Sequence, residues 1–187
     1  MNKYLYFLGY QGPNTLLALI LLMLYWQGET NPYAYVAVLL CKLVNHIINI
    51  SIKNFLKAPR PDSHKDPHFA HLKPTFKNFF TVHKEFGMPS GHAQDTVWEL
   101  TFLTLYFQKP WLTALATAQV ALTLWHRYAN RRHSIQQLAV GSSLGVLVGL
   151  GLFHLYKTYF TVDTALTVDT AVTVDTGLIV DPEITVM

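Results

Sequence analysis

The sequence predicts an all-α integral membrane protein, a bundle of about five transmembrane helices, on the basis of three observations. Hydrophobic residues make up 51% of the 187 residues and charged residues only 13%, whereas a soluble domain has roughly 25% charged residues. Long apolar runs alternate with short polar or proline-containing segments. No run before residue 161 requires a strand to explain it. The length favours one domain, which we place at residues 1–160.

The first apolar segments are short. Residues 4–10 suit an interfacial helix, because Tyr and Phe favour the membrane boundary. Gly12-Pro13-Asn14 breaks the run, and Leu16 to Trp26 follows as the first expected span. A crossing requires about 20 residues, so this segment could instead be re-entrant.

The second expected span, Tyr33 to Phe55, carries a stripe of polar residues. They recur at steps of three and four and therefore share one helical face: Lys42, Asn45, His46, Asn49 and Lys53. Such groups at membrane depth normally face the bundle interior or a watery cavity. For His46, a hydrogen bond between helices is favoured over a catalytic role.

Three further spans are expected at Ser90–Phe107, Trp111–Trp125 and His133–Phe153. The last is rich in small residues that allow close helix packing: Gly141, Ser142, Ser143, Gly145, Gly149 and Gly151. If all five segments cross, the connections 57–88 and 126–133 lie on the same membrane face. The 57–88 loop is too charged for the bilayer, and its His64, His68 and His71 are expected to be solvated.

The tail, residues 161–187, is a six-residue repeat that begins TVDTAL, TVDTAV, TVDTGL. Its alternation of residue types is β-like. Four repeats cannot bury much and have no second strand-like run to pair with. We therefore expect a poorly ordered tail rather than a small β-solenoid, and we assign it no chemistry.

The stretch Gly87-Met88-Pro89-Ser90-Gly91-His92-Ala93-Gln94 carries the first functional signal. Pro89 suits the first turn of a helix. Ser90 and Gly91 would then place backbone N–H groups at a helix N-terminus, where anions bind. His92, beside them, can carry a proton near neutral pH. A turn with an incidental histidine is the alternative.

Two other stretches favour the functional interpretation. Lys53 is followed by six residues and then Arg60-Pro61, and Arg127 is followed by five residues and then His133. If the chain brings the segments together, three cations and two histidines surround one anion seat. Arg suits such a seat because its planar fork binds two oxygens together.

These three stretches, in this order, resemble the signature of the type 2 phosphatidic acid phosphatase (PAP2) superfamily, which reads Lys-x6-Arg-Pro, Pro-Ser-Gly-His and Ser-Arg-x5-His-x3-Asp. The sequence departs from it twice, with His126 in place of Ser and Gln137 in place of Asp. Gln137, together with Gly87 to Gln94, resembles the dolichyl-diphosphatase branch. His126 does not fit that branch, and we include it among the candidate phosphate-binding residues.

The resemblance implies a phosphatase that acts without metal or another cofactor. His133 would attack phosphorus to form a phosphohistidine, and His92 would protonate the departing oxygen. Gln137, one turn after His133 on an expected helix, could accept the second ring N–H and so fix the tautomer. Lys53, Arg60, Ser90, Gly91 and Arg127 would bind the phosphate. Asp95 and Glu99 could supply negative charge beside His92 or pair with Arg131 or Arg132.

The expected substrate is a polyprenyl diphosphate of the dolichyl type, and a phosphatidate or general lipid phosphatase and a non-catalytic binder of lipid phosphates remain open. The net charge of +3 makes a nucleic-acid patch conceivable, but long apolar stretches flank the basic clusters, so we expect membrane lipid and a lipid phosphate as partners and no nucleic acid. The haloperoxidases of the superfamily are soluble, which disfavours them.

Cys41 is the only cysteine, which excludes an intrachain disulfide. We expect a multi-pass protein of the endoplasmic reticulum in a eukaryote or of the plasma membrane in a bacterium. The oligomeric state and membrane orientation are left open.

Overall fold

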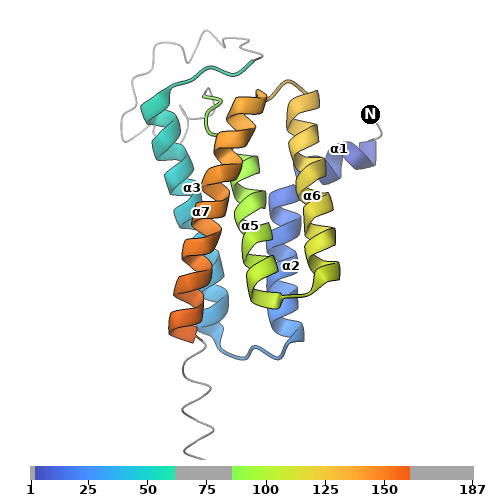
Figure 1. Ribbon diagram of the computed structural model, residues 1–187, viewed down its shortest axis with the longest axis vertical. Helices are drawn as coiled ribbons and strands as arrows, with labels where there is room; N and C mark the ends of the chain where they lie inside the picture. The colour runs from blue at the N-terminus through green and yellow to red at the C-terminus, as the bar shows by residue number, and fades with distance from the viewer. Residues whose placement is uncertain (1–2, 62–85, 161–187) are drawn as a thin grey trace, which may run out of the picture.

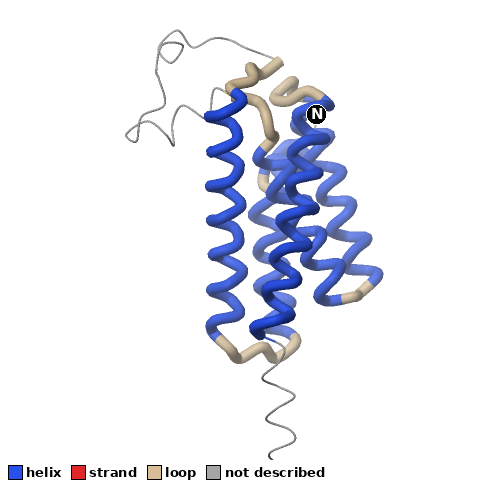
Figure 2. The backbone as a smooth tube through the Cα atoms, turned by 60° about the vertical axis from the view of Figure 1, so that its left-hand side comes forward, coloured by secondary structure: helices blue, strands red, loops and turns tan. Residues whose placement is uncertain are grey.

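The computed structural model describes residues 3–61 and 86–160, and all the regular elements in these ranges are helices. They are α1 (Lys3–Tyr10), α2 (Gly12–Trp26), α3 (Pro32–Leu56), α5 (Gly91–Phe107), α6 (Pro110–Ala129) and α7 (Ile135–Phe160). Five of them run side by side as a bundle, and α1 projects from its side (Figures 1 and 2). The all-α fold is therefore confirmed for these residues. The expected β-prone tail and the three loop histidines lie outside them.

The described helices include two that are long and apolar enough to cross a membrane, α3 and most of α7. A third candidate is the pair of α1 and α2, which is bent by 69° at the break between them. The sharp bend at Gln11-Gly12 fits an α1 that lies across the bundle rather than along it. Two or three membrane spans are thus supported by length and composition, and five crossings stay a prediction.

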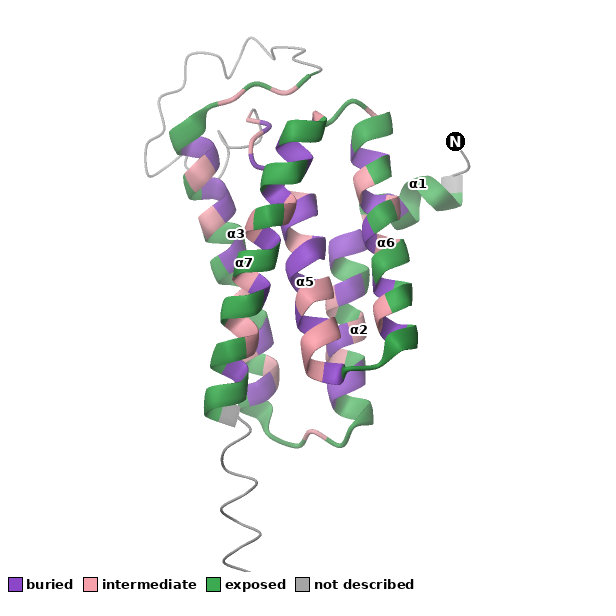
Figure 3. Ribbon diagram, in the orientation of Figure 1, coloured by how far each residue is buried: buried purple, intermediate pink, exposed green. Residues whose placement is uncertain are grey.

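The core lies between α2, α5, α6 and the lower part of α3, where large apolar side chains are fully buried, including Leu16, Trp98, Phe102 and Leu112. Helix α5 has buried side chains along its whole length (Figure 3). Three glycines of α7 let this helix approach α5 closely. A Cβ on Gly141 would lie 2.5 Å from the backbone oxygen of Ser90, and Gly145 and Gly149 are similarly close to α5, whereas Gly151 faces open space.

Several helix ends differ from those expected. Helix α6 continues to Ala129, so His126 and Arg127 lie in its last turn and not in a connection. Helix α7 begins at Ile135, so His133 precedes the helix. The reason is local: Ser134 Oγ accepts from the Gln137 N–H at 3.3 Å, and Gln137 Oε1 accepts from the Ser134 N–H at 3.2 Å. This reciprocal pair is a capping box that starts the helix after Ser134.

The start of α5 also differs by a residue or two. Ser90 is the N-cap of α5, and its Oγ lies 3.4 Å from the backbone N of Ala93. Pro89 therefore lies outside the helix, not in its first turn. Ser, Thr, Asp and Asn are favoured at this position because their side-chain oxygens satisfy an otherwise free N–H of the first turn. Gly91 and His92 consequently form the first turn of α5.

Candidate active site

The predicted site residues lie at one end of the bundle, uppermost in Figure 1. There α3 and α6 end, α5 and α7 begin, and the described connecting segments 57–61, 86–90 and 130–134 meet. Lys53 comes from the last turn of α3 and Arg127 from the last turn of α6. His92 lies in the first turn of α5, and His133 precedes α7. Antiparallel neighbouring helices therefore bring the three sequence motifs to the same level.

The cations of the site are close enough to interact electrostatically. The charges of Arg60 and Arg127 both act on Lys53. Lys53 and Arg127 are also buried, with only 5% and 7% of their surface exposed. Neither of these two forms a salt bridge with a carboxylate among the described residues. The charge of Asp95 reaches Lys53 and is the smallest of the charges that act on it, and burying like charges together is costly. A multiply charged oxyanion bound between them would offset that cost.

His133 is buried and held by its Nδ1 atom, which lies 2.9 Å from the Gly87 carbonyl oxygen and 3.2 Å from Gln137 Oε1. A carbonyl oxygen only accepts hydrogen bonds, so Nδ1 carries the proton and Nε2 keeps its lone pair. Burial, followed by the charges of Arg60, Arg127 and Lys53, lowers the pKa of His133 from 6.5 to about 3, and the Gln137 hydrogen bond opposes this shift. The ring is therefore neutral at physiological pH.

Gln137 joins the segments that surround His133. Its Nε2 donates to the carbonyl oxygen of Pro59 at 2.8 Å, while its Oε1 faces His133 Nδ1 and the Ser134 N–H. Pro59 pairs with Phe86 in an isolated antiparallel bridge, one residue before Arg60. The side chain thus contacts both the histidine and the segment that carries Arg60.

Gly87 completes this arrangement. Its N–H donates to the Ala58 carbonyl at 2.8 Å, and its own carbonyl accepts from His133. A Cβ at this position would lie 2.4 Å from Nε2 of Gln137, so only glycine fits without displacing the amide. Sequence reasoning treated Gly87 as part of a turn. The adjacent Met-Pro-Ser gave the only hint that Gly87 is near the site. Its carbonyl contact with His133 cannot be deduced from residue type.

The contact between His133 and Gln137 matches the predicted partners but not the predicted cause. His133 is not helical, so the two residues are not related by one helical turn. They meet because the capping box turns the Gln137 side chain back over the N-terminus of α7, toward the residue before Ser134.

The anion seat at α5 differs from the expected one in one donor. The Ser90 N–H donates to the Gln137 carbonyl at 3.1 Å, so it is not free for an anion. The N–H groups of Gly91 and His92 point into the same end of the bundle, whereas that of Ala93 faces the Ser90 hydroxyl. Ser90 itself is fully buried and its hydroxyl serves as the N-cap. The N–H and the hydroxyl of Ser90 therefore hold the local structure, and they do not serve the phosphate-binding role that was predicted for them.

His92 is oriented by α1, which sequence reasoning did not connect with the site. Its ring lies 5.6 Å from the ring of Tyr10, centroid to centroid, and it hydrogen-bonds to the Tyr10 backbone. Arg127 and Lys53 are both close enough to influence His92 electrostatically. The aromatic composition of residues 4–10 indicated a membrane interface, but not a contact with a catalytic candidate.

His126 does not join the cation cluster directly. Its side chain is 1% exposed and packs edge-on against the Tyr6 ring at 4.6 Å. Gly9 lies against it, and a Cβ there would be 2.6 Å from the His126 Cβ. Neither ring nitrogen has a hydrogen-bond partner among the described residues. A histidine enclosed by α1 is placed to hold that helix, which contacts His92.

Two further expectations need correction. Asp95 and Glu99 pair with Lys42, at 3.4 and 2.8 Å, and not with Arg131 or Arg132. The pairing follows from the antiparallel course of α3 and α5, which puts the middle of one opposite the middle of the other. His46 is exposed on the outside of α3, because it lies beside the inward stripe and not within it.

The fold and the site together define an α-helical membrane protein with a buried, electropositive, histidine-containing site at one end of its bundle. Residues 34–160, more than half of the chain, match the PAP2 superfamily, and the chain belongs to this superfamily. It is 30% identical over 119 residues to the dolichyldiphosphatase of Saccharomyces cerevisiae, covering 58% of this chain and 46% of that protein. The match thus spans less than half the length of that relative. No solved structure matches the chain.

Proposed function

We propose that the chain is a metal-independent lipid phosphatase that removes the terminal phosphate of a polyprenyl diphosphate, of the dolichyl type, through a phosphohistidine. The observation that carries the proposal is the state of His133. Its Nδ1 proton is held by a carbonyl, its Nε2 lone pair is available, and its ring is neutral beside three cations. A neutral, oriented imidazole next to an oxyanion site is what nucleophilic attack on phosphorus requires.

The reaction would proceed in two displacements. The anionic substrate, once bound, favours the protonated form of His92. Nε2 of His133 attacks the terminal phosphorus, the bond from phosphorus to the bridging oxygen breaks, and the protonated His92 gives its proton to that oxygen. Water then attacks the phosphohistidine, the phosphorus–nitrogen bond breaks, and His92 takes the proton from the water. Lys53, Arg60 and Arg127 stabilise the phosphoryl oxygens throughout, because these oxygens stay anionic in every state.

The diphosphate preference is supported by Gln137 and by the yeast relative. An amide orients His133 but lacks the carboxylate charge that would stabilise an imidazolium. A phosphate leaving group is better than an alkoxide and places less demand on the nucleophile.

We also propose that α5 and α6 cross the membrane beside α3, α7 and the bent α1–α2 pair, which gives five crossings. The protein would lie in the endoplasmic reticulum of a eukaryote or in the plasma membrane of a bacterium.

The test uses the purified chain in detergent with EDTA, given terminally ³²P-labelled polyprenyl diphosphate and, separately, labelled phosphatidate. We expect phosphate release from the diphosphate and acid-labile label trapped on the protein in a rapid quench. His133→Ala should give neither, yet still bind substrate through the cations. Preferred cleavage of phosphatidate would favour a general lipid phosphatase. No label and no release from either lipid would favour a non-catalytic binder.

A further inference from the structure

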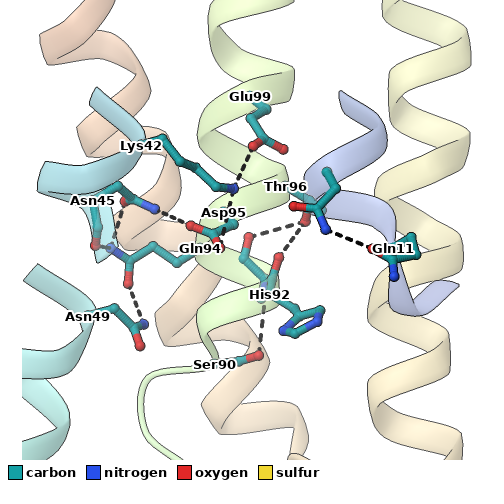
Figure 4. A network of polar contacts seen from close by, with 12 residues as sticks. Gln11, Lys42, Asn45, Asn49, Ser90, His92, Gln94, Asp95, Thr96 and Glu99 are labelled. Atoms are coloured by element: carbon teal, nitrogen blue, oxygen red, sulfur yellow. Dashed lines mark hydrogen bonds and ion pairs between the residues drawn. The ribbon is translucent and has the colours of Figure 1, made fainter. Parts of the chain in front are cut away.

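The upper half of α3 is joined to α5 mainly by polar side chains. Beyond residue 40, the buried residues of α3 are mostly polar: Asn45, Asn49, Ile50, Lys53 and Asn54. Two of them belong to a continuous chain of contacts that we call the polar ladder (Figure 4): Asn49, Gln94, Asn45, Asp95, Lys42 and Glu99. None of its members belongs to the proposed catalytic group.

The amides of the polar ladder all point the same way. Asn49 Nδ2 donates to Gln94 Oε1 at 2.7 Å, and Gln94 Nε2 donates to Asn45 Oδ1 at 2.8 Å. Asn45 Nδ2 then donates to the Asp95 carboxylate at 2.6 Å. A carboxylate can only accept, so Asp95, held by Lys42, determines the orientation of each amide in turn.

This order has a consequence at the Asn49 end of the ladder. With its Nδ2 directed at Gln94, Asn49 presents its Oδ1 to Gly91, where an added Cβ would lie only 3.2 Å from this oxygen. Gly91 begins α5 and the anion seat. Lys53 lies one turn beyond Asn49 on the same face of α3. The ladder therefore ends beside the first turn of α5, one turn of α3 before Lys53.

We propose that Gln94 is a positioning residue, which through Asn49 and Asn45 holds Lys53 of α3 in register with the anion seat of α5. Between helices in lipid, hydrogen bonds fix register where apolar packing cannot, because the lipid is as apolar as the side chains. Gln94 is fully buried and supplies all the direct hydrogen bonds in the middle of the ladder. Its role in catalysis rests on the proposed function, but its role in anion binding does not.

The test is the affinity for orthovanadate, measured by calorimetry on the full chain in detergent, which requires no turnover. Gln94→Met keeps length and volume but can neither donate to Asn45 nor replace the amide oxygen that accepts from Asn49. Each interhelical hydrogen bond of this kind is worth roughly threefold in an equilibrium, so losing the three bonds of Gln94 should weaken vanadate binding by up to about thirtyfold. In a Lys53→Met background the same change should cost less than about twofold, since no ammonium remains to be positioned.

Thr101→Val is the matched control. It also removes a polar group from α5, but among the described residues its hydroxyl bonds only to the Val97 carbonyl of its own helix, at 2.8 Å, and it faces α7. It should leave vanadate affinity unchanged. If Gln94→Met does not fold, Asn49→Ala, which removes only the last amide, serves in the same cycle with a loss of about threefold.

Two results would overturn the proposal: unchanged vanadate affinity in Gln94→Met, or an equal loss with and without Lys53, as a general weakening of the fold would give. A wild-type chain that binds vanadate but releases no phosphate from any lipid would instead overturn the proposed function. The vanadate cycle would still decide the role of Gln94.

Discussion

The substitution Gln137→Glu distinguishes the effect of the amide oxygen of Gln137 from that of its amide N–H group. The carboxylate has the same length and keeps an oxygen for His133 Nδ1 and for the Ser134 N–H, which lie 3.2 Å away in both cases. It cannot donate to the Pro59 carbonyl, which the amide reaches at 2.8 Å. Two oxygens would then face each other at the base of the segment that carries Arg60.

The size of the effect follows from that one lost donor. A buried acceptor left without its partner costs about 1–3 kcal/mol, and each 1.4 kcal/mol is about tenfold in rate when the arrangement is needed in the transition state. We expect kcat for the diphosphate to fall by about ten- to hundredfold in Gln137→Glu, with little change in KM. Gln137→Ala loses the acceptor as well and should fall at least as far.

Gln137→Asp distinguishes this reasoning from the family pattern. From the sequence alone, the family's Asp would be expected to keep or raise activity on monophosphate esters. Asp is one methylene shorter, however, and by geometry should reach neither Pro59 nor the Ser134 N–H. We therefore expect it to be slower than the wild type on both substrate classes. Single-turnover rates of phosphohistidine formation measure this directly, and an Asp variant as fast as the wild type would refute the argument.

Three further outcomes are expected. Activity should be retained in EDTA and strongly inhibited by vanadate, and a loss in EDTA restored by Mg²⁺ would contradict the mechanism. His92→Ala should slow phosphatidate cleavage by about 10²–10⁴-fold and diphosphate cleavage less, because phosphate is the weaker base; equal losses, measured as kcat side by side, would count against His92 as the acid. His133 has a pKa near 3 when folded and 6.5 when unfolded, so its protonation favours unfolding as pH falls below about 6.5. Between pH 7 and 5, the wild type should lose more melting temperature than His133→Ala.

The helices could be predicted from the sequence because each corresponds to an apolar run closed by Gly, Pro or a capping residue. All five expected spans became helices, and α1 was expected as a separate short one. Their ends were less accurate. Trp125 was the last residue of an apolar run, yet α6 continues to Ala129, because the side chains of His126 and Arg127 are buried inside the bundle. Hydropathy identifies lipid-facing residues, and a helix continues past them wherever a polar interior accepts its side chains.

The cluster of site residues was also predictable. The first and second motifs flank one connection, and two helices separate the second motif from the third, so all three lie at the same end of the bundle. The hydrogen bonds that orient them were not. The carbonyls of Gly87 and Pro59 and the backbone of Tyr10 belong to residues whose side chains give no hint of these contacts. Gln94 could have been singled out: it lies on α5 opposite two Asn residues spaced four apart on α3, and buried amides in membrane helices seek one another.

The two departures from the family pattern contact the groups that orient the two histidines. Gln137 touches His133 and the segment before Arg60. His126 lies 6.4 Å from the Tyr10 ring, centroid to centroid, and Tyr10 in turn contacts His92 at 5.6 Å. A smaller Ser at position 126 would leave space under α1, while the imidazole fills it. In the proposed reaction, Gln137 would therefore orient the nucleophile, and His126, through α1, would affect the position of the general acid.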